Sequence, residues 1–562
     1  MARVSGGQLV IDVLKARGAD TIFTLTGGQI TSIYEASRGA GIKIFDTRHE
    51  QAAGFMADAY ARLSLQPAVC LASAGPAFTN LLTPMANAYE AGSPVVFISG
   101  SAPLALRDSQ AFQELDQLPL ARPVTKWARQ VTETSRIAEY LAKAFYWASS
   151  GRPGPVYLDL PEDVLSGQAH RPGWSAPAGD PSQAAASPES NQVERVAKML
   201  LASRRPLLIA GSGVWYSRAW EELASLVEGA KLPSFTQDMG RGCLPDSHPY
   251  CLGWASPYPD SAFCLALARA DLVIVAGADL ARISDPLSRP RVIAIDADKE
   301  DGFWGLNDLV IMRGSIKHSF QAVNGALGKD LRPDGRGDWL SYILRARKEE
   351  IKRLLGRKNR DAPIHPFQLC QLIDSYLEPD ALMVVDGGDT CFWARMARRV
   401  NSPGLFLDAG PWHTLGVGLP FALAAKLKYP KRQVVLITGD GSLGFSLMEF
   451  NSAVRHGLPI VVVVNNDKSW GLIKHRQRMA YGPGGAIAAE LGLVRYDRLM
   501  EDFGGYGELV CKEEELLDAL GRAFESGRPA CLNVLTDPKV ASPAARGWAR
   551  QGQARKGGKV GR

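Results

Sequence analysis

Short runs of β-branched residues alternate with helix-length amphipathic segments along almost the whole chain. This alternation is typical of α/β folds, in which helices cover the faces of parallel sheets. One helix of the first third is expected from Glu50 to Leu63. Strands are expected at 20–25, 42–46, 68–72, 94–99 and 155–159, then at 206–210, 272–276 and 291–296, and finally at 381–386, 433–438, 459–465 and 529–535.

The chain is long enough for several domains. At roughly 100 to 200 residues per domain, 562 residues predict about three. Residues 167–190 are rich in Gly, Pro, Ala and Ser and lack apolar periodicity, which is typical of a linker. We expect three doubly wound parallel-sheet domains. The expected division is a first domain at 1–166, the linker at 167–190, a central Rossmann-like domain at 191–340, a linker helix at 341–362, a third domain at 363–540 and a basic, flexible tail at 541–562.

Charge and cysteine content exclude several classes of protein. A net charge of +6 over 562 residues is too weak to predict nucleic-acid binding. The eight cysteines are scattered without a CxxC pair, which indicates free thiols in a reducing compartment and neither a disulfide scaffold nor a zinc site. The N-terminal helix lacks the apolar core of a signal peptide, and apolar runs such as 459–464 are too short to span a bilayer. We therefore expect a cytoplasmic protein without a membrane segment.

The most informative segment is residues 434–471, which parse as strand, Gly-Asp-Gly turn, helix from near Ser446, strand and polar turn. Parallel strands end on the same edge of a sheet, so Asp440 and Asp467 are expected to lie close together. The glycines beside Asp440 would let the backbone approach a phosphate, whose charge the helix amides favour. A Mg²⁺ ion bridging carboxylates and a diphosphate is the expected ligand. A Gly-Asp-Gly turn alone would indicate only a structural turn.

Together with the polar turn at Asn466 and Asp467, this arrangement resembles the diphosphate-binding motif of thiamine diphosphate-dependent enzymes. The resemblance implies that Mg²⁺ is held by Asp440, Asp467 and the backbone carbonyl of Ser469. The second ligand is commonly Asn in that family, so Asp467 is a departure unless the register slips by one to Asn466. An extra carboxylate would bind Mg²⁺ more tightly and would repel the diphosphate.

The first domain extends the resemblance. Residues 45–62, FDTRHEQAAGFMADAYAR, resemble the segment that carries the activating glutamate of these enzymes. The resemblance implies that Glu50 is catalytic and hydrogen-bonds N1′ of the cofactor's aminopyrimidine ring. A buried carboxylic acid suits that role. By itself, Glu50 would indicate only an acid favoured by a helix dipole.

Further segments match the family in chain order. The resemblance implies that Gln113 is catalytic and faces the reacting substrate. Gln29 of TGGQ is the other expected catalytic residue, because its amide can hydrogen-bond a substrate oxygen. Alone, Leu415 would indicate a core residue and Thr390 a helix cap. The other implied cofactor contacts are Gly75 and Asn80 beside the pyrimidine ring, Gly388, Asp389 and Thr390 at the diphosphate, His413 and Leu415 at the pyrimidine ring and the bend of the cofactor, and Gly439, Gly441, Ser442, Trp470 and Gly471 in the diphosphate motif.

The resemblance also implies the assembly. The first, central and third domains correspond to a pyrimidine-binding, a central and a diphosphate-binding domain. In this family the activating acid and the metal motif of one site come from different subunits, which implies a homodimer or homotetramer.

The reaction is expected to make or break the bond between a carbonyl carbon and an adjacent hydroxylated carbon. The sequence is similar to acetolactate synthase-like proteins, 2-hydroxyacyl-CoA lyases and benzaldehyde lyase. Gln29 stands where benzaldehyde lyase has His. Because an amide cannot shuttle a proton at neutral pH, this difference argues against a benzaldehyde lyase. Pyruvate-type decarboxylases use a His-His pair in the first domain, and the only similar feature here is Arg48-His49. The sequence therefore argues against pyruvate decarboxylation.

We expect a 2-hydroxyacyl-CoA lyase that forms an aldehyde or ketone and formyl-CoA. An acetolactate synthase-like or benzaldehyde lyase-like carboligase is the alternative. A catalytically silent nucleotide-binding protein is a more distant alternative, and it would be expected to lack Glu50 or Asp440, which are both present.

Two regions leave alternatives open. The turn at Gly211–Gly213 follows a strand and is interpreted either as a nucleotide site, for an ADP-type ligand in preference to FAD, or as a structural turn. The basic tail is interpreted as disordered, or as a flap that orders over an anionic substrate such as an acyl-CoA. The basic stretch at 345–360 is interpreted as a solvated helix face.

Overall fold

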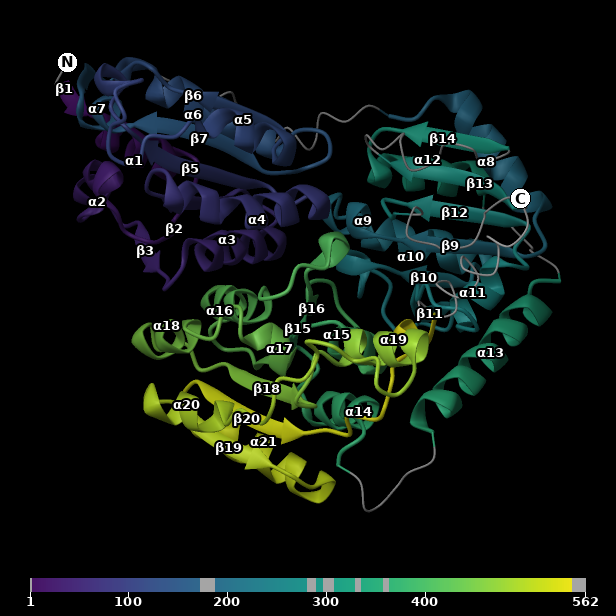
Figure 1. Ribbon diagram of the computed structural model, residues 1–562. Coiled ribbons are helices and arrows are strands. Elements are labelled where there is room, and N and C mark those ends of the chain that lie inside the picture. The colour runs from purple at the N-terminus through teal and green to yellow at the C-terminus, as the bar shows by residue number, and fades with distance from the viewer. Residues whose placement is uncertain are drawn as a thin grey trace, which may run out of the picture. The chain divides into compact units, whose positions relative to one another are not determined.

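The computed structural model describes residues 3–171, 187–279, 290–296, 308–328, 335–356 and 363–547 (Figure 1). The chain divides into two compact units, which are considered separately. Unit 1 comprises Met1–Ala184, Ala409–Pro430 and Ser446–Leu458, and unit 2 comprises the remainder. Most of the expected linker at 167–190 lies outside the described residues, as do residues 357–362 of the linker helix and 548–562 of the tail.

Unit 1 is built on a six-stranded parallel sheet of order β3-β2-β4-β5-β7-β6. A short antiparallel pair, β1 (Arg3–Ser5) with β8 (Gln168–His170), joins the two ends of its first segment. The sheet strands are β2 (Thr21–Thr24), β3 (Lys43–Asp46), β4 (Ala68–Ala72), β5 (Val95–Ser101), β6 (Trp127–Gln130) and β7 (Val156–Pro161). The helices are α1 (Gly6–Ala16), α2 (Thr31–Ser37), α3 (Glu50–Ser64), α4 (Pro76–Ala91), α5 (Gln117–Ala121), α6 (Ile137–Ser149), α7 (Glu162–Ser166), α16 (Gly418–Lys428) and α18 (Glu449–Arg455).

Helix α3 is fixed at its start and along its buried face. His49 caps its start, because its Nδ1 accepts a hydrogen bond from the Gln51 amide at 3.0 Å. Along the helix, α16 packs on α3. Arg62 is buried with its guanidinium paired to Asp58 at 2.6 Å and lies 5.1 Å from the centre of the Phe421 ring. This packing gives Glu50, the first residue of α3, a fixed support.

Unit 2 contains two further six-stranded parallel sheets. The central sheet has the order β11-β10-β9-β12-β13-β14, and the third sheet has the order β16-β15-β17-β18-β20-β19. The central strands are β9 (Pro206–Ala210), β10 (Ser234–Thr236), β11 (Cys251–Trp254), β12 (Leu272–Ala276), β13 (Arg291–Asp296) and β14 (Leu309–Arg313). The third sheet comprises β15 (Leu382–Asp386), β16 (Phe406–Leu407), β17 (Val434–Gly439), β18 (Val461–Asn466), β19 (Tyr506–Val510) and β20 (Ala530–Leu535).

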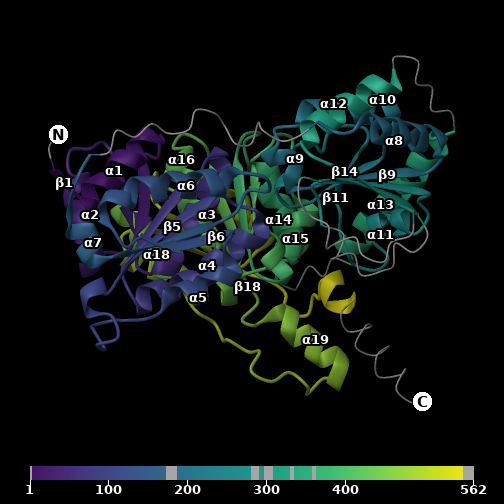
Figure 2. The same cartoon turned by 90° about the horizontal axis from the view of Figure 1, so that it is seen from above.

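Helices cover both faces of the central sheet. In Figure 2, α8, α10 and α12 lie on one side of it and α11 and α13 on the other. These helices are α8 (Ser190–Ala202), α10 (Trp220–Ala230), α11 (Ala262–Leu267), α12 (Ile316–Leu327) and α13 (Gly337–Leu355), with the short α9 (Ser212–Tyr216) after β9. The helices of the third region are α14 (Pro366–Tyr376), α15 (Asp389–Ala397), α17 (Asp440–Leu443), α19 (Gly471–Tyr481), α20 (Tyr496–Asp502) and α21 (Leu516–Glu525).

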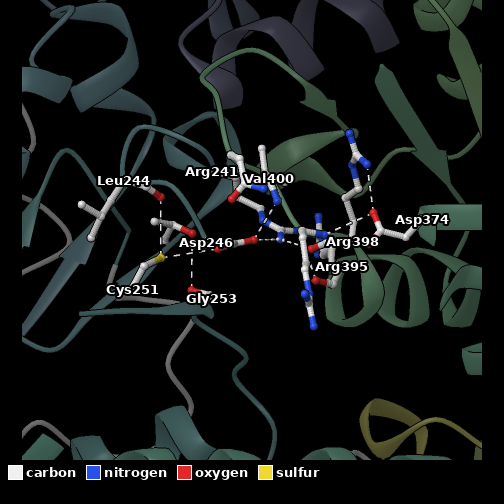
Figure 3. Close-up of polar contacts among 12 residues, drawn as sticks. Arg241, Leu244, Asp246, Cys251, Gly253, Asp374, Arg395, Arg398 and Val400 are labelled. Carbon is white, nitrogen blue, oxygen red and sulfur yellow. Dashed lines mark hydrogen bonds and ion pairs between the residues drawn. The ribbon is translucent and has the colours of Figure 1, made fainter. Parts of the chain in front are cut away.

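A buried ion network ties the central region to α15 (Figure 3). The Arg241 guanidinium donates to the carbonyls of Arg395 at 3.0 Å and Arg398 at 2.8 Å, and it lies 3.2 Å from the Asp246 carboxylate. Asp246 also accepts from the Val400 amide at 2.8 Å. The cation thus binds carbonyls at the C-terminal end of α15, where the helix dipole favours it. The network anchors the helix that begins at Asp389.

The α/β fold with three parallel sheets is confirmed. The expected helix from near Ser446 was wrong in its start. The chain forms the short α17 directly at Asp440, then a turn in which the Glu449 amide donates to the Ser446 carbonyl at 2.9 Å, and only then α18. Among the described residues, none of the helices combines the length and apolarity that crossing a membrane requires. The domain boundaries stay predictions.

Candidate active site

Unit 2 brings three carboxyl groups together at the carboxyl ends of its third sheet. Strands β17 and β18 pair in parallel with Gly439 opposite Asn465, so Asp440 and Asp467 follow at the same edge. Burial, together with the nearby Asp467 charge, raises the pKa of Asp440 to about 7. The third group, Asp389, follows β15, the neighbour of β17 on its other side. Sequence reasoning assigned Asp389 to the diphosphate loop and did not identify it as a member of this cluster.

Asp389 shares the environment of the other two acids. Its pKa is raised to about 7, first by burial and further by the Asp467 charge. A Cβ atom on Gly471 would collide with Oδ2 of Asp467 and lie 3.8 Å from Oδ2 of Asp389. On its other side, Asp389 accepts a hydrogen bond from the Ser542 hydroxyl. The cluster is therefore crowded, desolvated and negatively charged when ionised.

These residues fit a hard divalent cation. Oδ2 of Asp440 is buried and has no hydrogen-bond partner, which is costly unless a ligand satisfies it. No group of three or more His, Cys, Asp or Glu side chains suited to a metal ion occurs in the part of the chain that the structure describes. The donors proposed from the sequence are fewer: the two carboxylates of Asp440 and Asp467 and the backbone carbonyl of Ser469. All three are oxygen donors, which suit Mg²⁺.

The structure distinguishes Asp467 from its neighbour Asn466. The Asn466 amide donates to Oδ1 of Asn533 at 2.9 Å, and its Oδ1 accepts from the Lys468 amide at 3.1 Å. Asp467 instead accepts from the Ser469 amide at 3.1 Å and lies in the acidic cluster. Of the two register alternatives, the geometry favours Asp467.

Glycines allow close packing beside this cluster. Gly387 has φ +111°, and a Cβ there would lie 3.2 Å from Oγ of Ser442 and 3.4 Å from the Gly439 amide. A Cβ on Gly441 would overlap the Trp470 ring. The remaining expected contacts are placed as follows: the Ser442 hydroxyl donates to the Gly439 carbonyl at 3.1 Å, Thr390 accepts from Asn465 at 2.8 Å, and Gly388 starts α15 against Leu472.

Glu50 lies in unit 1, at the start of α3 after β3, as the sequence predicted. Its Oε2 accepts a hydrogen bond from the Asn80 side chain on α4 at 2.9 Å. Glu50 and Asn80, both expected near the pyrimidine ring, are thus brought together. His413, with φ +54°, and Leu415 also belong to unit 1; His413 is exposed and Leu415 is partly buried.

The two glutamines expected at the substrate are in contact. The Gln29 amide donates to Oε1 of Gln113 at 3.3 Å, and Oε1 of Gln29 accepts from the Ser73 hydroxyl. Gly75, with φ +55°, permits the close approach of this loop, because a Cβ there would lie 2.8 Å from the Gln113 carbonyl oxygen. We call Gln29, Ser73 and Gln113 the neutral triad.

Two supporting residues were missed from the sequence. Gln117 is buried; its Oε1 accepts from the Gly75 amide at 3.0 Å, and its amide donates to the Tyr157 hydroxyl at 3.0 Å. Glu449 on α18 accepts from the Arg48 amide at 3.0 Å, in the loop before Glu50. Burial raises the pKa of Glu449 to about 7. A glutamine or glutamate in an amphipathic segment gives no sequence signal for such roles.

The central glycine turn favours the structural interpretation. The amide of Gly211 donates to the Ala276 carbonyl at 2.9 Å, and that of Gly213 donates to the Gly277 carbonyl at 3.0 Å. A Cβ on Gly213 would lie 2.6 Å from the Gly277 Cα, so the glycines let two loops pack closely. The two amides are therefore already used within the fold, and a nucleotide at this turn stays a prediction.

Comparison with known proteins gives the family. Three thiamine pyrophosphate enzyme models match in order: the N-terminal TPP binding domain at residues 4–120, the central domain at 193–322 and the C-terminal TPP binding domain at 386–534. The chain is 34% identical to a probable acetolactate synthase of Mycobacterium bovis over 567 residues, covering 96% of each chain. It is 32% identical to 2-hydroxyacyl-CoA lyase 2 of Caenorhabditis elegans, covering 94% of this chain and 89% of that one, and 31% identical to the human protein of the same name, covering 94% and 90%. The chain belongs to the thiamine pyrophosphate enzyme family.

Proposed function

We propose that this enzyme cleaves a 2-hydroxyacyl-CoA into an aldehyde or ketone and formyl-CoA, with thiamine diphosphate and Mg²⁺. The reaction breaks the bond between the thioester carbonyl carbon and the hydroxylated carbon. The hydroxyl gives up its proton as its carbon becomes the new carbonyl, and the thioester carbon takes up a proton, which gives formyl-CoA. When bound, thiamine diphosphate supplies the nucleophilic carbon and the electron sink for this step. Asp440, Asp467 and the carbonyl of Ser469 hold the metal, and Glu50, held by Asn80, hydrogen-bonds the pyrimidine ring.

The single observation that carries the choice of substrate is the neutral triad. Its members present amide and hydroxyl groups, which hydrogen-bond a carbonyl or hydroxyl oxygen without offering a positive charge. A 2-oxo acid brings a carboxylate, for which a cationic partner is the favoured recognition group. A thioester or an aldehyde is uncharged at its reacting end and suits the neutral triad.

Acetolactate synthesis is the second candidate, and the 34% identity to a probable acetolactate synthase favours it. Purified protein with thiamine diphosphate and Mg²⁺ would be supplied separately with a 2-hydroxyacyl-CoA, benzoin and pyruvate. Formyl-CoA plus an aldehyde from the first supports the proposal. Acetolactate from pyruvate, with no cleavage of the thioester, would replace it with the synthase, and benzaldehyde from benzoin would replace it with a benzaldehyde lyase.

Glu50→Gln tests the activating role directly. We expect kcat to fall by about 10²- to 10⁴-fold, because the ring loses its acid, while the Kd for thiamine diphosphate changes little. Glu35→Gln, an exposed acid of the same unit that pairs with Arg38, is the matched control and is expected to retain activity. Full activity of Glu50→Gln would exclude the mechanism.

We further propose that the enzyme works as a homodimer or homotetramer in the cytoplasm. The eight cysteines are present as free thiols, which supports a reducing compartment. The family resemblance, with its sites between subunits, supports the assembly. Light scattering during size-exclusion chromatography gives the mass in solution, and a monomer of full activity would contradict the proposal.

A further inference from the structure

The loop that carries Gln113 has an unusual backbone. Asp108, Gln110 and Gln113 all have positive φ, at 63°, 59° and 59°, although none is glycine. Residues other than glycine have a steric cost in the left-handed region of backbone conformation, so three such residues within one short loop store strain. Strain of this kind persists only where surrounding contacts over-determine the conformation. One such contact here is a carboxylate that accepts hydrogen bonds from two amides of the loop.

Glu114 clamps this loop from within. Its Oε1 accepts from the Asp108 amide at 2.6 Å and its Oε2 accepts from the Ala111 amide at 2.9 Å, so each carboxylate oxygen holds one turn of the loop. The Glu114 amide closes the last turn by donating to the Ala111 carbonyl at 3.0 Å. The two amide bonds also lower the pKa of Glu114, so the clamp is ionised at neutral pH.

The clamp acts next to the neutral triad. Gln113 immediately precedes Glu114, its side chain accepts from Gln29, and its backbone lies against the Gly75 turn. We propose that Glu114 is a positioning residue that holds Gln113 in its left-handed conformation and so directs its side-chain amide to Gln29 and the substrate. This inference rests on the proposed function for its kinetic consequence, while its structural part is independent of that function.

The first experiment compares Glu114→Ala with Asp116→Asn. Asp116 lies in the same loop segment, starts α5 without a side-chain cap, and therefore controls for loss of negative charge. In Glu114→Ala we expect the amides of Asp108 and Ala111 to exchange hydrogen faster, and kcat/KM with the 2-hydroxyacyl-CoA to fall about tenfold or more. The Kd for thiamine diphosphate is expected to stay within about twofold of the wild-type value, because the clamp acts on the loop that carries Gln113.

A double-mutant cycle separates positioning from general damage. If Glu114 acts through Gln113, Glu114→Ala should have little further effect in a Gln113→Ala background. Rescue offers a second readout. In the Glu114→Ala background, Asp108→Gly removes the steric cost at one strained position, so part of the lost kcat/KM should return.

Two outcomes overturn the inference. One is a Glu114→Ala variant with the exchange rates and kinetics of Asp116→Asn. The other is a double variant whose loss of kcat/KM equals the product of the losses in Gln113→Ala and Glu114→Ala, which would mean that the two residues act independently. Should the wild-type protein cleave none of the substrates, the proposed function fails. The exchange of the Asp108 and Ala111 amides then still decides whether Glu114 holds the loop, because that measurement needs no turnover.

Discussion

Replacing Asp440 by Asn is expected to stabilise the metal-free protein at high pH while removing its stabilisation by Mg²⁺. The structure raises the pKa of Asp440 from 3.8 to about 7, first through burial and then through the Asp467 charge. This rise of about three pH units corresponds to about 4 kcal/mol of cost for ionising the group in the fold. Asn fills the same space without the charge.

The sign of the pH dependence follows from the raised pKa. Below about pH 4, the folded and unfolded chains both carry the proton, and Asp440 does not affect stability. Between about pH 4 and 7, the unfolded chain releases the proton and the folded one keeps it, so stability falls as pH rises. Above about pH 7, the full cost remains unless a cation binds. Asp440→Asn removes this contribution, so its advantage over wild type should grow from pH 4 to pH 7 and then level off.

Thermal unfolding followed by calorimetry checks this, at pH 5 and pH 8, with EDTA or with saturating Mg²⁺ and thiamine diphosphate. Because neighbouring acids also titrate, the informative quantity is the difference between Asp440→Asn and wild type at each pH. Asp380→Asn, an exposed acid paired with Arg432 in the same unit, is the matched control. An Asp440→Asn advantage that does not change with pH, or an equal gain from Mg²⁺ in both proteins, would refute the reasoning.

Three other substitutions test the supports of the site. Gly471→Ala should weaken Mg²⁺ binding by about tenfold or more in calorimetric titration, because the new methyl group collides with the Asp467 carboxylate. Asp58→Ala should lower the free energy of unfolding by about 3 to 5 kcal/mol in urea titration, because the buried Arg62 guanidinium loses its charge partner. Glu449→Ala should cost about 1 to 3 kcal/mol and lower kcat, because the Arg48 amide in the loop before Glu50 loses its carboxylate acceptor.

The substitutions at Gly471 and Asp58 each have a control of the same kind. Gly484→Ala places a methyl group where no atom lies within 4 Å, so Mg²⁺ affinity should not change. Asp12→Ala removes a partly exposed ion pair with Arg171 and should cost under about 1 kcal/mol. Equal effects of a substitution and its control would contradict the role assigned to Gly471 or Asp58. For Glu449, unchanged unfolding and unchanged kcat would do so.

Most interior strands could be predicted because both of their faces are buried, but the three-residue interior strand β10 was missed. The strand expected at 68–72 is β4 to the residue, and 206–210 is β9, since each is a continuous apolar run. The edge strands β6 and β19 escaped prediction for the opposite reason, although the edge strand β3 was predicted at 42–46. β6 reads WARQ and β19 reads YGELV, and their polar residues obscure the pattern of a buried strand.

The residues of the candidate site also fall into those that the sequence could predict and those that it could not. Spacing and parallel topology placed Asp440 beside Asp467, because the strands that precede them are adjacent in the sheet. Glu114 and Gln117 could not be found, because their roles depend on hydrogen bonds to backbone amides of a loop whose conformation has no sequence signature. The third acid, Asp389, required the position of β15 in the sheet order.

The packing of α16 on α3 has a consequence for how the chain is made. Helix α3 emerges early from the ribosome, but the segment that covers it, including Phe421, is synthesised only after residues 65–417. At a translation rate of roughly 5 to 20 residues per second, the apolar face around Phe55 stays exposed for tens of seconds before Phe421 is synthesised and can pack on it. Nascent chains of this protein are therefore expected to need a chaperone during that interval, and truncated products that stop before α16 should be prone to aggregate.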